Sequence, residues 1–64
     1  MLITNRQKEI VELLSKGYTR KDISKKLFIG EETVKSHIRN VRMKNYKRNV
    51  AHLVADSIRE GIID

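Results

Sequence analysis

The chain has 64 residues, with 14 Lys and Arg against 8 Asp and Glu, a formal net charge of +6, and no Cys or Pro. This is the size of one small domain, residues 1–64, which leaves little room for a deep catalytic pocket, so we expect no enzyme. The absence of Cys excludes disulfides and thiolate metal sites. No apolar run approaches the ~18 residues of a membrane span or forms a signal peptide, so we expect a cytoplasmic protein without membrane contact. The basic excess favours a polyanionic partner, and a merely solvated basic surface is an equal alternative on charge alone.

Aliphatic residues at helical spacing, with little Gly and no Pro, predict an all-α domain. We expect four helices, at about residues 5–16, 20–27, 31–44 and 50–60. The first begins at a capping box formed by Thr4 and Gln7, and Gly17 suits the left-handed residue after its end. A weaker version of the same box, Thr19 with Asp22, begins the second helix.

The connections between the later helices carry their own signals. Phe28 to Gly30 predict a tight turn whose apolar side chains are tucked into the core, with Gly30 as the cap of the third helix. Asn45 falls on the buried face of that helix, where burial of its amide would be costly, so we expect it to be the left-handed terminator. Asn49 is the expected cap of the last helix. Gly61 ends that helix and leaves Ile62 and Ile63 as an apolar tail.

The third helix combines one apolar face with an unusually specific polar set. Val34, Ile38 and Val41 lie on one face, and the opposite face carries Lys35, Ser36, Arg39 and Met43. Two helices joined by a short turn that contains Gly match the helix-turn-helix pattern, whose second helix fits the DNA major groove. There Arg39 can bind guanine O6 and N7, Lys35 can do so less directionally, and the small Ser36 permits close approach. A solvated basic face is the alternative, and the spacing does not choose between the two.

Other polar residues suit contacts to DNA phosphates, which set register but carry little sequence information. They lie along one flank of the third helix, at the start of the second helix, and in the last connection: Thr33, His37, Asn40 and Lys44; Thr19, Arg20 and Lys21; Lys47 and Arg48. Thr19 can equally be only a helix cap. His37 has no partners at metal-ligand or catalytic spacing, so we expect no metal and no cofactor. Arg6 is expected to pair with a carboxylate of the domain.

The order of these residues resembles the DNA-binding domain of LuxR/GerE-type regulators. The most specific part of the family pattern is Thr-Val-Lys-x-His-x-x-Asn-Ile-x-x-Lys, which stands here as Thr33, Val34, Lys35, His37, Asn40, Val41 and Lys44. The resemblance covers nearly the whole chain. It implies a four-helix fold, a tri-helical core plus a C-terminal helix, and a transcriptional regulator that binds specific double-stranded DNA. It also implies base contacts at Lys35, Ser36 and Arg39.

The family pattern departs from this chain between the third and fourth helices. The family usually has Leu-Gly-Val where Asn45, Tyr46 and Lys47 stand, and its last helix often makes the dimer contact. We therefore expect a homodimer through the C-terminal helix, with Val50, Leu53, Val54 and Ile58 as its surface. The family domain usually follows a receiver or sensing domain, so the chain is either a stand-alone regulator or a separated domain.

Two other functions stay open at this point. The chain could be a stand-alone module that binds RNA polymerase or another regulator through the last helix and Ile62–Ile63. It could also bind nucleic acid without sequence preference through net charge alone, which would give a steep salt dependence. Only three aromatic residues are present, which disfavours a stacking platform for single strands.

Overall fold

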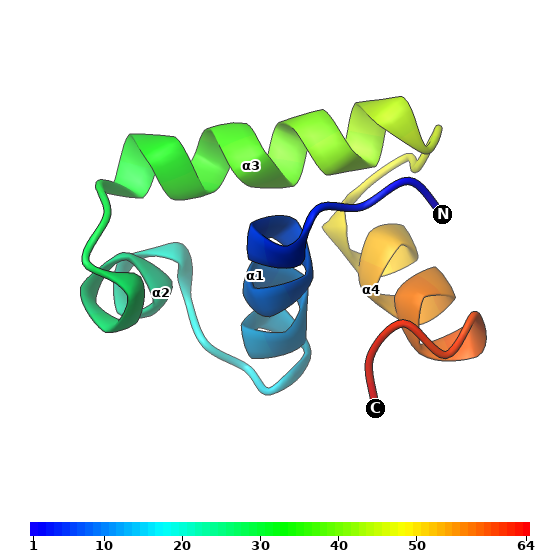
Figure 1. Ribbon diagram of the computed structural model, residues 1–64, viewed down its shortest axis with the longest axis horizontal. Helices are drawn as coiled ribbons and strands as arrows, with labels where there is room; N and C mark the ends of the chain where they lie inside the picture. Colours follow the sequence, from blue (N-terminus) through cyan, green and yellow to red (C-terminus); the bar gives the residue numbers. More distant parts are fainter.

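The computed structural model describes all 64 residues and contains four helices. They are α1 (Asn5–Ser15), α2 (Arg20–Leu27), α3 (Glu31–Lys44) and α4 (Val50–Arg59). In Figure 1, α3 runs across the top of the molecule, with α1 steeply inclined below its middle, α2 at the left and α4 at the right. The predicted all-α fold is confirmed, with helix boundaries within one residue of those expected. None of the helices has both the length and the apolar composition needed to cross a membrane.

The helix starts follow the capping residues of the sequence. The Thr4 hydroxyl accepts the Gln7 N–H at 3.1 Å, and the Gln7 Oε1 accepts the Thr4 N–H at 3.0 Å. Thr19 and Asp22 repeat this reciprocal pair at 3.1 and 3.0 Å. The Asn49 side chain accepts the His52 N–H at 2.8 Å at the start of α4. These pairs satisfy backbone donors that have no partner inside the helix, so the predicted caps are confirmed.

All four helices end in the same way. One residue adopts a left-handed conformation, and the N–H of the next residue bonds to a carbonyl five residues earlier, which is the Schellman motif. These bonds run from Tyr18 to Leu13, Ile29 to Ser24, Lys47 to Arg42 and Ile62 to Ser57, at 2.8–3.2 Å. The left-handed residues are Gly17, Phe28, Tyr46 and Gly61. The prediction that Asn45 terminates α3 is therefore wrong, because Asn45 has φ −106° and Tyr46 takes the left-handed conformation.

Asn45 has a different function in the fold. Its Oδ1 accepts the Leu2 N–H at 2.7 Å, and its Nδ2 donates to the carbonyls of Leu2 and Val41 at 2.7 and 2.8 Å. The amide is thus fully hydrogen-bonded in a half-buried position, which removes the cost of burial that the sequence suggested. It fastens the N-terminal segment to the end of α3. Figure 1 shows these two segments near each other at the upper right.

The core consists of two hydrophobic clusters that meet at α1. Ile10, Ile23, Val34 and Ile38 join α1, α2 and α3. Val11, Val41, Leu53 and Ile63 join α1, α3, α4 and the C-terminal segment. Because Ile10 and Val11 are adjacent, α1 contributes to both clusters and packs against α3 through both of them. This packing leaves the opposite side of α3 exposed.

The packing corrects three sequence-based expectations. Phe28 is 93% exposed, so it is not tucked into the core; Ile29, the residue after the left-handed position, packs there instead. Ile63 is 4% exposed and belongs to the second cluster, so it is not a free apolar tail. Leu53 is fully buried within the chain by the same cluster, so it does not contribute to a dimer surface.

Candidate nucleic-acid interface

The exposed side of α3 carries the residues that the sequence assigns to base contacts. Val34, Ile38 and Val41 are buried on the core side. The structure brings Lys35, Ser36 and Arg39 together on the other side, with Lys35 and Arg39 exposed and Ser36 half-buried. The core therefore fixes which face of α3 is presented to a partner.

A shallow basic hollow lies beside this face. It has a volume of about 160 Å³ and lies where the first residues of α2 and α4 meet the middle of α3. Its lining residues are Arg20, Lys35, Ile38, Arg39, Arg42 and Val50. None of its four cations forms an ion pair with a carboxylate. Unneutralised cations around a concave surface concentrate an anionic partner there, so the hollow suits a phosphate group.

The start of α2 adds further positive charge at the surface. Arg20 and Lys21 are exposed in the first turn of the helix. The Thr19 side chain is used as a cap, and the Thr19 N–H donates to Asp22, whose pKa this hydrogen bond lowers. Asp22 thus stays ionised and neutralises part of the positive helix end. The cations Arg20 and Lys21 therefore supply most of the attraction for phosphate at this point.

The flank of α3 is accessible along its length. Thr33, Asn40 and Lys44 are exposed, and His37 is half-buried. They follow one another at intervals of three or four residues, so they share one side of the helix. No group of three or more His, Cys, Asp or Glu side chains is arranged to hold a metal ion, here or elsewhere in the fold.

Lys47 does not reach the solvent in the manner expected of a phosphate ligand. Its Nζ lies 2.8 Å from Asp56 Oδ2 and 3.9 Å from Glu60 Oε2, and its side chain is only 13% exposed. Asp56 also binds Arg59 at 2.9 Å and His52 Nε2 at 3.0 Å. The hydrogen bond from Lys47 lowers the pKa of Asp56. Lys47 therefore has a structural role in the fold, which disfavours the DNA contact predicted for it.

Arg42 has a part that the sequence did not suggest. Its NH1 donates to the carbonyl of Arg48 at 2.8 Å and to that of Lys47 at 3.5 Å. One guanidinium thus binds the connection between α3 and α4 while the same side chain lines the basic hollow. A cation in the last turn of a helix commonly binds nearby carbonyls, which is the signal that could have found it. Arg6 forms the carboxylate pair expected of it, with Glu9 at 3.5 Å.

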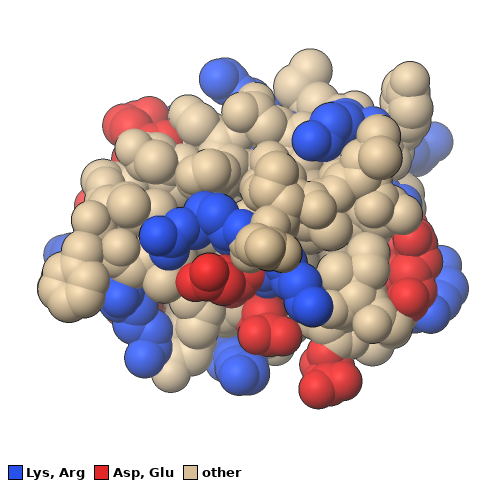
Figure 2. Space-filling view, viewed as in Figure 1, with Lys and Arg blue, Asp and Glu red and all other residues tan.

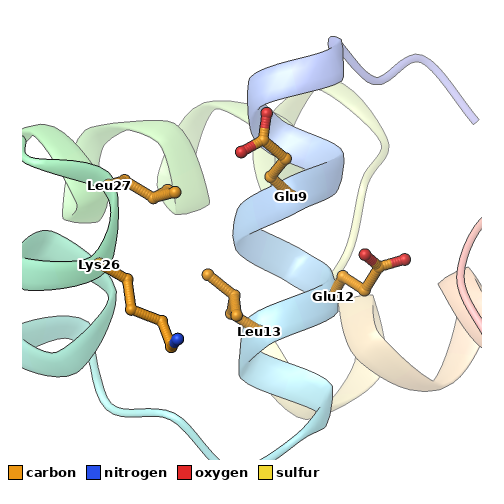
Figure 3. Close-up of a pocket in the computed structure, with 5 residues that line it drawn as sticks. All are labelled: Glu9, Glu12, Leu13, Lys26 and Leu27. Carbon is orange, nitrogen blue, oxygen red and sulfur yellow. The ribbon is translucent and has the colours of Figure 1, made fainter.

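The side of the molecule seen in Figures 1 and 2 has a different character. Figure 2 shows acidic groups over its middle and lower parts, below α3, mixed with Lys and Arg. A hollow of about 290 Å³ between α1 and α2 is lined by Glu9, Glu12, Leu13, Lys26 and Leu27. In Figure 3, Leu13, Lys26 and Leu27 extend into the space between these helices, while Glu12 points to the other side of α1. Mixed charge and an apolar floor do not suit a polyanion.

Comparison with known proteins agrees with this geometry. Residues 1–55 match the family model of bacterial regulatory proteins, luxR family. The spore germination protein GerE of Bacillus subtilis is 36% identical over 63 residues, which are 98% of this chain and 85% of GerE. A solved structure of the transcription factor GerE superimposes with a TM-score of 0.95, covering 100% of this chain and 96% of that one.

Longer relatives match over the same region. The transcriptional regulatory protein DegU of Brevibacillus brevis is 33% identical over 60 residues, 94% of this chain and 25% of DegU. The oxygen regulatory protein NreC of Staphylococcus haemolyticus is 32% identical over 63 residues, 98% of this chain and 29% of NreC. The fold, the exposed basic helix and these matches together show that the chain belongs to the luxR family of bacterial regulatory proteins and is a helix-turn-helix DNA-binding transcription regulator.

Proposed function

We propose that this protein binds specific double-stranded DNA sequences with α3 in the major groove. The observation that carries the proposal is the division of α3 into a buried aliphatic face and an exposed face with unpaired Lys35 and Arg39. Arg39 would bind guanine through O6 and N7, and Lys35 would reach neighbouring acceptors. Ser36 is small and half-buried, so it would let the helix approach the base edges closely.

Phosphate contacts would fix the register of α3 in the groove. The proposed ligands are Thr19, Arg20 and Lys21 at the start of α2, and Thr33, His37, Asn40 and Lys44 along the flank of α3. The basic hollow, which lies on the other flank of α3 between the starts of α2 and α4, would receive the DNA backbone, since no carboxylate lines it.

The regulator would act as a homodimer through α4. Val50 and Ile58 are 38% and 49% exposed, and Val54 between them is half-buried. Their spacing of four residues places them along one stripe of the helix. One domain of this size buries too little surface for tight specific binding, whereas two domains on a repeated site would double the contact. Regulation of transcription through DNA requires no enzymatic step, and we assign none. No observation favours RNA polymerase or another regulator as the first partner, because Ile63 is buried.

Two variants separate the proposed base contact from the proposed phosphate contacts. Arg39→Ala should weaken binding to the selected site by about 5–150-fold while changing binding to random duplex much less. Lys21→Ala should weaken binding to both duplexes alike and reduce the slope of log K against log salt by about one. Arg59→Ala removes an exposed cation at the end of α4, below α3 in Figure 1, and is the control for lost charge. Equal losses for Arg39→Ala on both duplexes would refute the proposed base contact.

A further inference from the structure

Two aromatic residues occupy positions in this fold that folding alone does not favour. The left-handed position after each helix is taken by glycine at α1 and α4 but by Phe28 at α2 and Tyr46 at α3. The left-handed conformation is costly for any residue with a Cβ atom. Burial does not offset that cost here, because Phe28 is 93% and Tyr46 is 91% exposed.

The turn that carries Tyr46 is held on both sides. Asn45 before it is hydrogen-bonded to Leu2 by two 2.7 Å contacts. Lys47 after it is ion-paired with Asp56 at 2.8 Å, and Arg42 binds the carbonyls that follow. Tyr46 is thus a freely exposed side chain on a backbone fixed by its neighbours. Such an arrangement lowers the entropy lost when the side chain meets a partner.

The surroundings of Tyr46 are basic, whereas those of Phe28 carry both signs of charge. Tyr46 lies between Lys44 and Arg48, neither of which forms an ion pair. Phe28 instead lies between two lysines in the last turn of α2 and two glutamates in the first turn of α3, which are Lys25, Lys26, Glu31 and Glu32. The phenol of tyrosine can also donate a hydrogen bond to an anion, which a phenyl ring cannot. Only Tyr46 therefore combines exposure, basic neighbours and a donor.

We propose that Tyr46 contacts the DNA backbone at the end of α3, with its hydroxyl donating to a phosphate and its ring packing on the adjoining deoxyribose. The inference rests on the proposed insertion of α3 into the major groove. Arg39 and Lys44, the last residue of α3, are five residues apart, roughly 7.5 Å along the helix axis, and Tyr46 lies two residues beyond that end. With Arg39 over a base, this span together with the Tyr46 side chain would reach the strand that borders a groove about 12 Å wide. Tyr46 would then help to set the depth and tilt of α3.

Three substitutions test the contact by measuring thermal stability and DNA affinity in parallel. In Tyr46→Gly, relief of the left-handed strain opposes the greater freedom of glycine in the unfolded chain, so Tm should stay constant or rise by up to about 5 °C. The DNA affinity of Tyr46→Gly should fall about fivefold or more on both the selected site and random duplex. A fivefold loss corresponds to removal of roughly 40 Å² of apolar contact with the DNA. Tyr46→Phe, which removes only the hydroxyl, should lose about threefold.

Phe28→Gly is the matched control, because it relieves the same strain at the other end of α3. Its Tm should change in the same direction, and its DNA affinity should stay equal to that of the wild type. None of the three changes alters charge, so the salt dependence of binding should stay constant throughout. Wild-type affinity in Tyr46→Gly, or a fall in its Tm, would overturn the contact while leaving the proposed function intact. If the wild-type protein does not bind duplex DNA, both proposals fail.

Discussion

Removal of one amide should release the N-terminal segment from α3. Asn45→Ala deletes both hydrogen bonds to Leu2, from Oδ1 to its N–H and from Nδ2 to its carbonyl, each 2.7 Å long. A net value of about 0.5–1 kcal/mol for each bond in this exposed setting gives a loss of about 1–2 kcal/mol. For a domain of this size that corresponds to a Tm lower by roughly 5–15 °C. The third bond, to Val41, adds little, because the Val41 carbonyl also accepts the Asn45 N–H.

Urea denaturation followed by circular dichroism would give the free energy of unfolding, and amide hydrogen exchange would locate the change. The Leu2 amide should lose protection in Asn45→Ala. Asn45→Leu fills a similar volume without the hydrogen bonds and should show the same loss of protection. Asn49→Ala, which removes the cap of α4, should destabilise by about 1 kcal/mol yet leave the Leu2 amide protected. A cost below about 0.3 kcal/mol for Asn45→Ala, or a Leu2 amide that exchanges freely in the wild type, would refute the reasoning.

Other parts of the fold give independent predictions. The hydrogen bond with Lys47 lowers the pKa of Asp56 from 3.8. This carboxylate therefore stabilises the fold above pH 3.8, and its contribution is lost as the pH falls through the lower pKa of the folded state. The urea midpoint of Asp56→Asn should fall less steeply in acid than that of the wild type. Leu53→Ala should cost about 2–4 kcal/mol of unfolding free energy. Ile58→Ser should change stability by no more than about 0.5 kcal/mol but weaken self-association in sedimentation equilibrium; unchanged association would contradict the proposed dimer surface. Thr19→Ala should lose about 1 kcal/mol by thermal unfolding through the missing cap.

The helices and their starts could be predicted because their signals are local. Thr4 with Gln7, and Thr19 with Asp22, act over three residues, and the structure contains both pairs. The buried face of α3 follows from helical spacing in the same way, which also determines the face left for Lys35 and Arg39. Their base contacts stay predictions.

Two side chains have partners on other elements of the fold, which the local sequence pattern does not show. The hydrogen-bond partner of Asn45 is Leu2, which lies 43 residues earlier, so the sequence around Asn45 suggests an amide without a partner. The ion-pair partner of Lys47 is Asp56, which belongs to the next helix, so the sequence around Lys47 suggests only a solvent-exposed cation. Neither pairing leaves a local pattern in the sequence.

Ile63 and Leu53 were misplaced for a related reason. An apolar tail and an apolar helix stripe have the same composition whether they pack inside the chain or against a partner. The second core cluster takes both residues, which only the arrangement of α1, α3 and α4 reveals.

Selection of binding sites from a random pool of duplex DNA, at near-physiological salt, tests the central claim most directly. The proposed function predicts enrichment of a defined motif made of two half-sites, because a dimer presents α3 twice. Arg39→Ala should lose preference at one position within each half-site. Binding without enrichment would contradict sequence recognition by α3 and leave a charge-driven association, and no binding would contradict DNA as the partner.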